Sequence, residues 1–352
     1  MGARFNIGSV AVGDGCDPFI IAEAGINHNG NVTLAKQMVR VASESGVDAV
    51  KFQTFRTEDF IADRSVEYTY KSQGIEVTES MFDMFKRTEF TDDEWREIKA
   101  YCDECGITFL STPVSERDLD LLVGLGVGAV KVGSDDFTNI PLITSFARRG
   151  LPMLLSCGMA DGEEMEMTLD AAKAVNPDIC LFLCTSQYPT PSEDVNAAKL
   201  LSMSERFPDV VLGFSDHTRG CTGAIVATAY GAKVFEKHFT LDHGLPGPDH
   251  WFASEPDELK AWAAGIREAS KMVGSSELSP TVEERKMRDL ARRSIVALRD
   301  IAEGETLTEE NVGLRRPGTG MSPARLPEVL GCVAARAIAA EALICPQDYV
   351  EE

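Results

Sequence analysis

The chain has 352 residues, 44% of them hydrophobic, which is enough for one large domain with a buried core and a smaller second domain. Its net charge of −22 at pH 7 argues against nucleic acid or an anionic membrane as a partner, because both bind cationic surfaces. No apolar run is long enough to span a membrane, and the first residues lack the apolar stretch of a secretory signal. We therefore expect a cytoplasmic protein.

The cysteines indicate reduced thiols rather than disulfides. There are nine of them, an odd number, and they follow no regular spacing. The one C-x-x-C motif, from Cys102 to Cys105, lacks the second pair that a zinc site requires.

Short apolar runs alternate with segments of helical period over most of the chain. The predicted strands are Phe19–Ala24, Asp48–Thr54, Ile107–Thr112, Ala129–Ser134, Pro152–Cys157, Ile179–Thr185, Val210–Ser215 and Lys233–His238. The predicted helices include Thr33–Ser45, Thr91–Cys105, Asp194–Phe207, Gly220–Tyr230 and Pro256–Val273.

Eight continuously apolar strands, most of them followed by a helix, predict an α/β fold in which a parallel sheet closes as a (β/α)8 TIM barrel. An open doubly wound sheet is the alternative, but it would favour a glycine-rich nucleotide turn after the first strand. The segment Gly25–Gly30 lacks the G-x-G-x-x-G spacing of such a turn.

Two segments interrupt this alternation. The long charged segment Arg56–Glu89 is either a substrate cover at the catalytic face of the barrel or an ordinary surface insertion. The linker-like segment Gly274–Pro280 then separates a barrel domain, residues 1–280, from a small strand-containing domain, residues 281–352.

The ends of the predicted strands carry polar side chains, and in a TIM barrel that is where chemistry is built. His217 and His238 end two consecutive strands, which predicts a divalent metal held by two imidazoles with coordination positions left open. Strand alternation points Lys237 away from them, and His28 is a candidate third imidazole. The loop that contains His243 and His250 is expected to overhang the same face.

Buried lysines and small hydroxyl groups indicate an anion site beside the predicted metal. A buried ammonium group needs a partner, so Lys51 and Lys131 favour an anion between them. The hydroxyl groups that converge with Lys131 predict a phosphate cradle and belong to Ser134, Ser156, Ser186 and Ser215. The alternative is a set of polar core layers that satisfy one another.

The motifs of this chain resemble those of the sialic acid synthase (N-acetylneuraminate synthase) family over nearly its whole length. The matching segments are Ala22–Gly30, Val50–Thr54, Lys131–Ser134, Tyr188–Pro189, Gly213–Gly220, Glu236–Thr240 and Gly247–His250. In the tail, Arg292–Ser294 and Arg316–Gly318 are similar to the antifreeze-like (SAF) domain that ends this family's chains.

The resemblance implies an enzyme that condenses phosphoenolpyruvate, N-acetylmannosamine and water to N-acetylneuraminate and phosphate, with C–O cleavage of phosphoenolpyruvate. It implies that His217 and His238 bind a divalent metal, which is Mn²⁺ or alternatively Mg²⁺ or Co²⁺. It also implies that Lys131 and the four serines of the cradle bind phosphoenolpyruvate. The residues implied to line the sugar site are Glu23, Lys51, Gln53, Thr112, Tyr188 and Asp249, with Glu23 and Lys51 also counted as catalytic. Asp136 is the candidate that orients or deprotonates the water.

The family also implies a domain-swapped homodimer, in which the SAF domain of one subunit caps the partner's barrel and Arg316 reaches the N-acyl group of the sugar. Ser186 and Asp136 stand where relatives often have Asn and Glu, which leaves the acceptor open. The alternative acceptor is a 2,4-diacetamido hexose, as in legionaminic or pseudaminic acid synthases. A carbohydrate-binding protein without catalysis, or an ice-binding one acting through the SAF domain, is the alternative outside enzymes.

Overall fold

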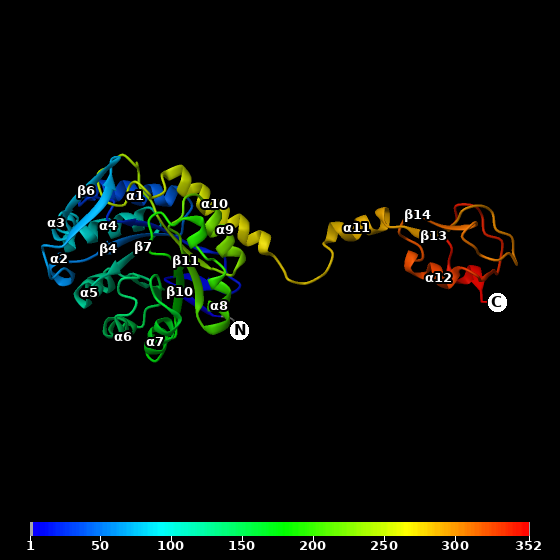
Figure 1. The fold of residues 1–352 in the computed structure, drawn as a ribbon, viewed down its shortest axis with the longest axis horizontal. Helices are drawn as coiled ribbons and strands as arrows, with labels where there is room; N and C mark the ends of the chain where they lie inside the picture. The colour runs from blue at the N-terminus through cyan, green and yellow to red at the C-terminus, as the bar shows by residue number, and fades with distance from the viewer. Residues whose placement is uncertain (1–2, 352) are drawn as a thin grey trace. The chain divides into compact units, whose positions relative to one another are not determined.

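The computed structural model describes residues 3–351 and divides the chain into two compact units, residues 1–274 and 275–352 (Figure 1). The boundary expected from the sequence lies after residue 280, and residues 274–281 form neither helix nor strand, so both divisions fall in one extended segment. Among the helices of the described residues, none has the length and apolar character needed to cross a bilayer.

The first unit is built around eight parallel strands. They are β3 (Phe19–Gly25), β4 (Ala49–Thr54), β7 (Thr108–Pro113), β8 (Val130–Val132), β9 (Met153–Ser156), β10 (Ile179–Cys184), β11 (Val211–Ser215) and β12 (Val234–His238). Their hydrogen-bonded order is β7-β4-β3-β12-β11-β10-β9-β8, and β8 also contacts β7. The sheet is therefore a nearly closed barrel, which confirms the predicted fold class.

Helices follow the strands and pack around them. They are α1 (Val32–Glu44), α4 (Asp92–Glu104), α5 (Glu116–Gly124), α6 (Ile140–Ala147), α7 (Gly162–Lys173), α8 (Lys199–Arg206), α9 (Thr222–Ala229) and α10 (Pro256–Val273). Helix α4 begins where the sequence predicts, because Thr91 and Glu94 form a capping box. The helix predicted from Asp194 begins only at Lys199, after the short 3-10 turn Ser192–Asp194.

The strands bury side chains on both faces. Outward residues pack against the helices in one large apolar cluster, and inward residues form a second cluster at the amino ends of the strands. An N-terminal hairpin, β1 (Arg4–Ile7) and β2 (Val10–Gly13), adds Phe5, Ile7 and Val12 to the inner cluster. The hairpin therefore closes the end of the barrel opposite the predicted site.

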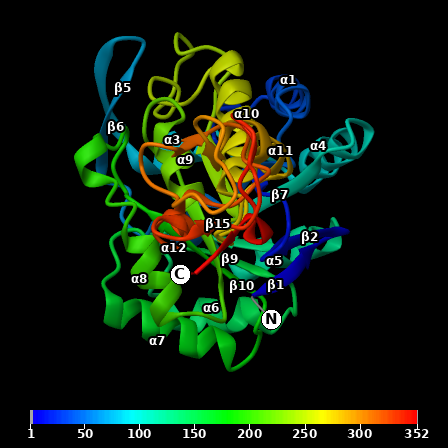
Figure 2. The ribbon, with the colours of Figure 1, turned by 90° about the vertical axis from the view of Figure 1, so that its right-hand side faces the viewer.

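The insertion Arg56–Glu89 folds as α2 (Thr57–Phe60), the antiparallel hairpin β5 (Glu67–Ser72) and β6 (Ile75–Ser80), and α3 (Met81–Lys86). Figures 1 and 2 show this hairpin and the β1–β2 hairpin on opposite sides of the barrel unit. Gln73 donates to the carbonyl of Gly244 at 2.9 Å, and Ser72 accepts from the amide of Gly247 at 3.1 Å. The insertion is thus tied to the loop that follows β12.

The second unit contains α11 (Val282–Ala291), β13 (Ser294–Ala297), β14 (Val312–Arg315), the short helix α12 (Leu326–Val329), β15 (Val333–Ala334) and β16 (Tyr349–Val350). Strand β13 pairs with β14 and β15 with β16, both antiparallel. Their core includes Ile295, Ile301, Leu307 and Ile344, all at most 1% exposed. Helix α11 buries none of its residues.

Candidate active site

A cavity of about 340 Å³ opens at the carboxyl ends of the barrel strands. Strand alternation builds its wall, because residues at i and i+2 point to the same face. The predicted site residues that line it are Glu23, Lys51, Gln53, Thr112, Lys131, Ser134, Ser156, Ser186, Tyr188, Ser215, His217 and His238. The structure thus brings together most of the side chains singled out in the sequence.

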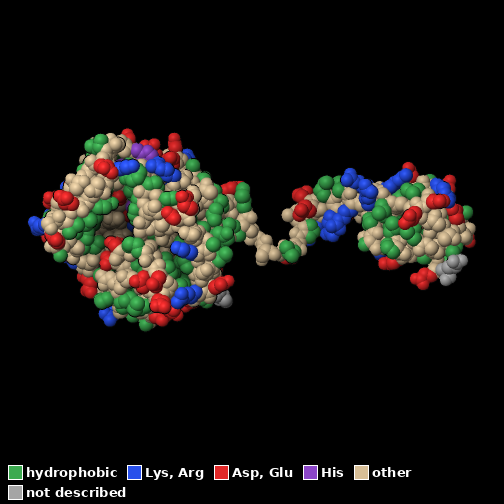
Figure 3. Space-filling model, viewed as in Figure 1, with side chains coloured by type: hydrophobic (Ala, Val, Ile, Leu, Met, Phe, Trp, Pro, Cys, Tyr) green, Lys and Arg blue, Asp and Glu red, His purple; other side chains and the backbone are tan. Residues whose placement is uncertain are grey.

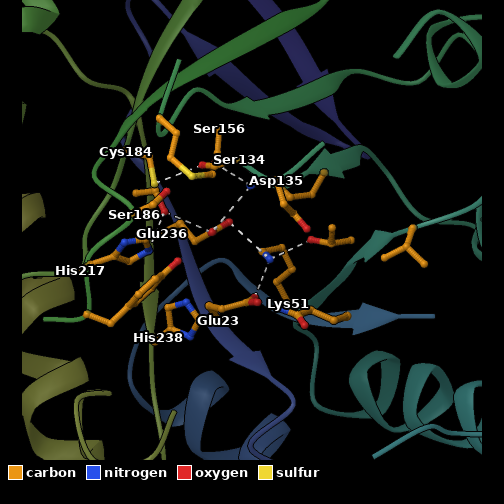
Figure 4. Close-up of a pocket in the computed structure, with 18 of the residues that line it drawn as sticks. Glu23, Lys51, Ser134, Asp135, Ser156, Cys184, Ser186, His217, Glu236 and His238 are labelled. Atoms are coloured by element: carbon orange, nitrogen blue, oxygen red, sulfur yellow. Dashed lines mark hydrogen bonds and ion pairs between the residues drawn. The ribbon is translucent and has the colours of Figure 1, made fainter. Parts of the chain in front are cut away.

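Two lysines and two glutamates form a buried charge cluster at the base of this cavity (Figure 4). Lys51 Nζ lies 2.7 Å from Glu23 and 3.7 Å from Glu236, and Lys131 Nζ lies 3.9 Å from Glu236. Burial raises the pKa of Glu23 to about 7, although Lys51 opposes this shift. Burial alone would raise the pKa of Glu236, but Lys131 and Lys51 outweigh it and lower that pKa.

Hydroxyl groups surround Lys131 as the sequence predicts. Lys131 Nζ donates to Ser156 Oγ at 2.7 Å, and Ser134 Oγ accepts from the amide of Gly158 at 3.1 Å. A Cβ atom at Gly158 would lie 2.6 Å from Ser134 Oγ and 2.5 Å from Ser186 Oγ. Residue 158 must therefore be glycine for these two hydroxyl groups to occupy their present places beside the lysine.

His217 and His238 lie side by side, with ring centroids 5.4 Å apart. His217 Nδ1 donates to the Thr185 carbonyl at 2.7 Å, so the lone pair is on Nε2, which faces the Ser215 hydroxyl group at 3.5 Å and is the ring atom that would bind a metal. His238 Nδ1 is buried without a hydrogen-bond partner. Burial lowers the pKa of both rings, so both are neutral, the form that binds metals.

This pair fits a divalent ion that takes its remaining ligands from substrate and water. Within residues 3–351 no cluster of three or more His, Cys, Asp and Glu side chains is arranged to hold a metal. A site with two protein imidazoles leaves several coordination positions open, which suits a catalytic ion rather than a structural one.

A second buried cluster lies behind the histidines, on the helix-facing side of β11 and β12. Asp216 accepts from Trp262 Nε1 at 2.8 Å and from the Thr218 hydroxyl at 2.7 Å, and it pairs with Lys237 at 3.1 Å. Lys237 also donates to the Thr218 carbonyl. Lys237 thus points away from the cavity, as alternation predicts, and the cluster ties together the two strand ends that carry His217 and His238. The sequence places Asp216 at a strand end but gives it no role there, because its partner Trp262 is distant in the chain.

Three predicted site residues lie outside the cavity lining. Asp136 accepts from Asn139 Nδ2 at 2.9 Å, and its neighbour Asp135 lines the cavity instead. Asp249 lies 3.8 Å from His238 Nδ1, and burial raises its pKa to about 6. Arg316 belongs to the second unit, where it is exposed.

His28 is not a third imidazole of the cavity. It stacks on Phe90 with ring centroids 4.2 Å apart and is fully buried among Phe52, Phe90 and Trp95. Its Nδ1 accepts from the amide of Gly30 at 3.1 Å. The expectation is wrong because His28 follows the strand end by three residues and its ring joins the aromatic core between β4 and α4.

Comparisons with known proteins agree with this geometry. The NeuB family profile matches residues 38–278, and the SAF domain profile matches residues 292–350. A protein of Methanocaldococcus jannaschii, named only as uncharacterized, is 41% identical over 93% of each chain. The N,N'-diacetyllegionaminic acid synthase of Legionella pneumophila is 37% identical over 89% of each chain.

A crystal structure of the N-acetylneuraminic acid (sialic acid) synthetase of Leptospira borgpetersenii, in complex with citrate, superposes with a TM-score of 0.74. It is 30% identical, and the match covers 82% of this chain and 95% of that one. The family profile covers more than half of the chain. The protein therefore belongs to the NeuB family, the sialic acid synthase-like enzymes that condense phosphoenolpyruvate to nonulosonic acids, with an SAF domain at its C-terminus.

Proposed function

We propose that the enzyme condenses phosphoenolpyruvate with an N-acyl aldose, N-acetylmannosamine in the first instance, to give N-acetylneuraminate and phosphate. The observation that carries this proposal is the location of a neutral histidine pair and a lysine–serine cradle in one cavity. A carbohydrate-binding protein has no need for that combination.

The base of the cavity supplies the contacts for phosphoenolpyruvate. Lys131 offers a positive charge beside Ser156, and the hydroxyl groups of Ser134, Ser186 and Ser215 offer neutral donors. Only 3% of Lys131 is exposed, so its charge is little screened by water. Burial lowers the pKa of Lys131, and an anionic substrate would restore it.

A Mn²⁺ ion on His217 and His238, with Mg²⁺ or Co²⁺ as alternatives, would supply a Lewis acid for the aldehyde oxygen of the open-chain sugar. The chain's own groups bind and orient the sugar: Glu23, Gln53, Thr112 and Tyr188 line the cavity, and Asp249 lies beside His238. Lys51, held at 2.7 Å from Glu23 and 3.1 Å from Thr112, is placed to give a proton to the new hydroxyl group.

The proposed reaction forms one carbon–carbon bond and releases phosphate. The C3 carbon of phosphoenolpyruvate bonds to the aldehyde carbon, and the cation left at C2 takes a water molecule. That water loses one proton to give a hydroxyl group at C2. As the C2 carbonyl forms, this hydroxyl gives its remaining proton to the phosphate, which leaves with its bridging oxygen. Asp136 is our candidate from the sequence to hold or deprotonate this water, and Asp135, which lines the cavity, is the candidate that the geometry favours.

The second candidate function keeps this chemistry and changes the acceptor to a 2,4-diacetamido hexose. It is favoured by the extent of the match, because a diacetyllegionaminic acid synthase matches 89% of this chain at 37% identity and the human N-acetylneuraminate-9-phosphate synthase matches 82% at 36% identity. A pseudaminic-type acceptor has the same two acylamino groups and is tested by the same panel.

We further propose a domain-swapped homodimer in which the SAF domain caps the partner's barrel. The support is helix α11, whose apolar side chains Val282, Met287 and Leu290 are 64%, 55% and 68% exposed. Apolar side chains that are exposed together on one helix mark a protein contact.

We also propose a cytoplasmic location, because the nine free cysteines are in keeping with a reducing compartment.

The experiment is a phosphate-release assay with phosphoenolpyruvate, Mn²⁺ and a panel of N-acyl hexosamines, with the product identified by mass. Release only with an acceptor present, together with a nine-carbon keto acid product, supports the proposal. Sugar binding without phosphate release under every condition favours the carbohydrate-binding alternative instead.

The cap is tested separately with Arg316→Ala. We expect this variant to raise KM for the sugar by about tenfold or more, because a charged hydrogen bond contributes about 1.5–3 kcal/mol. KM for phosphoenolpyruvate should stay nearly unchanged. Equal changes in both constants would contradict a role for Arg316 at the sugar.

A further inference from the structure

One side of the active-site cavity is apolar, in contrast to its charged base. Phe55, Phe60, Phe85 and Val114 form this side, which we call the apolar wall. The three phenylalanines contact one another edge to face, with ring centroids 5.0 to 5.5 Å apart. None of these four residues has a role in the reaction proposed at the base of the cavity.

Strand register connects the wall to the catalytic groups. Lys51, Gln53 and Phe55 follow one another at intervals of two along and just beyond β4, so they form one inward row from the base of the cavity to its mouth. Thr112 at the end of β7 and Val114 just beyond it do the same. Along β4 and β7, the polar side chains that can contact a ligand therefore lie deep in the cavity, and the apolar side chains lie near its mouth.

The wall faces His217 across the cavity, whereas His238 ends β12, two places from β4 in the strand order. In the strand order, β4 lies four places from β10, and β7 lies four places from β11, so each pair is diametrically opposed in an eight-stranded ring. Tyr188 follows β10 and His217 follows β11, and Figure 4 shows His217 and Lys51 on opposite sides of the pocket. A sugar whose aldehyde end lies at the histidines points its far end toward the wall.

The wall also carries exposed apolar surface. Phe55 is only 3% exposed, whereas Phe60 is 38% exposed, and Met159 at the same rim is 73% exposed. A large aromatic ring left in water at a pocket mouth gains free energy when an apolar group of the ligand covers it. The hydroxyl groups of an ordinary hexose find no hydrogen-bond partner on these four side chains.

We propose that the apolar wall is a specificity subsite that receives a methyl-bearing substituent on the distal half of the acceptor, as in a 2,4-diacetamido hexose. The inference rests on the proposed function and decides between its two acceptors. A hydrophobic pocket distinguishes ligands that differ by one or two carbon groups by about 10- to 200-fold, so we expect kcat/KM for the diacetamido sugar to exceed that for N-acetylmannosamine within that range.

The test compares both sugars with the full-length protein and three variants. Phe60→Ser and Phe85→Ser should reduce the preference for the diacetamido sugar about tenfold or more, mainly through its KM. Ile75→Ser is the matched control, because Ile75 is a 65% exposed apolar residue of the same insertion and does not line the cavity. It should keep the wild-type preference. Melting temperatures and gel filtration accompany each variant, and Phe60→Ser carries the test alone if Phe85→Ser, at the less exposed of the two positions, does not fold.

Any one of the following outcomes overturns the inference. Equal use of the two sugars by the wild type, or an unchanged preference in both phenylalanine variants, contradicts the wall alone. Loss of activity with both sugars together with loss of the oligomer would show that a second subunit covers the wall. Absence of phosphate release with any sugar contradicts the proposed function itself, and the inference with it.

Discussion

The two ends of the barrel interior are built from different residues, although the same eight strands supply both. At the amino ends the inward side chains are apolar, for example Phe19, Leu154 and Val234, and the β1–β2 hairpin packs onto them. At the carboxyl ends the inward positions carry buried charges and imidazoles, for example Lys131, Glu236 and His238. Along β9, a step of two residues from Leu154 to Ser156 changes the surroundings from one kind to the other.

This contrast separates stability from chemistry along each strand. The amino end removes apolar surface from water, which is the dominant favourable term in folding. The carboxyl end desolvates charged groups, which is unfavourable unless they are paired or bind a ligand. Substitutions at the carboxyl end should therefore change activity with little change in stability. Substitutions at the amino end should lower stability with little change in activity. The acidic side chains spread over the outer surface belong to neither end (Figure 3).

The largest effect is expected at the carboxyl end, for His217→Ala or His238→Ala. Loss of one of two imidazoles should reduce kcat/KM by about a thousandfold or more, since a catalytic metal contributes several kcal/mol. Melting temperature should be nearly unchanged, because each ring lies at the cavity and its aromatic neighbours, Tyr188 and Phe252, are not among the buried core residues. Steady-state kinetics and calorimetry check both statements. A variant with substantial activity would contradict the assignment of the pair.

At the amino end, Ile7→Ala should have the reverse effect. Ile7 is 1% exposed and packs in the inner cluster, so its truncation should lower the free energy of unfolding by about 2–5 kcal/mol. Denaturant unfolding measures this change. KM for both substrates below the melting temperature should match the wild type, and a large change in either would show that the two ends are coupled.

Between these extremes lies Asp216→Asn, which keeps the shape of the side chain and removes its charge. Because Asp216 joins Lys237 and Trp262 behind both histidines, we expect Mn²⁺ affinity to fall about 10- to 100-fold. Titration calorimetry with Mn²⁺ alone measures this affinity without any turnover. Asp242→Asn, at an exposed position of the following loop, is the control. Unchanged Mn²⁺ affinity with lower stability would make the cluster structural only.

The smallest effect concerns the pH dependence of stability. Burial lowers the pKa of His28 to about 3, whereas the unfolded chain keeps a pKa near its ordinary 6.5. Between these values the unfolded state binds the extra proton, so stability falls as the pH falls below the unfolded pKa. His28 should contribute about 2 kcal/mol of this loss between about pH 7 and about pH 5.

Urea unfolding at both pH values, for the wild type and for His28→Gln, measures that contribution. The variant is expected to be less stable near neutrality but to lose less stability on acidification. The same loss in both proteins would mean that other groups, such as His250, cause it.

The sequence predicts the barrel well because its strands are long apolar runs bounded by clear turns. Strand β10 begins at Ile179 as predicted, and β12 ends at His238 as predicted. The β1–β2 hairpin was not predicted, since Arg4–Gly13 is short and its apolar residues pack against strand residues that are distant in the sequence. The start of α8 was predicted too early, because acidic residues near Asp194 resemble a first helical turn.

For the site, alternation within strands was the reliable guide. It turned Lys237 away from the histidines, as the structure confirms, and the same period puts Ser215 with His217 and Glu236 with His238 in the cavity lining. Residues beyond the strand ends were harder to place, because loop geometry has no fixed period. The structure therefore lines the cavity with Asp135 rather than Asp136, and it buries His28 in an aromatic cluster. The apolar wall depends on tertiary contacts of α2 and α3 that no local pattern contains.

The most direct test of the central claim is phosphate release by the wild-type protein after metal removal with EDTA, followed by titration with Mn²⁺. The account predicts no turnover of phosphoenolpyruvate and the acceptor without metal, and full recovery on addition of Mn²⁺, because His217 and His238 then hold the ion beside Lys131. A near-normal rate in EDTA would contradict it.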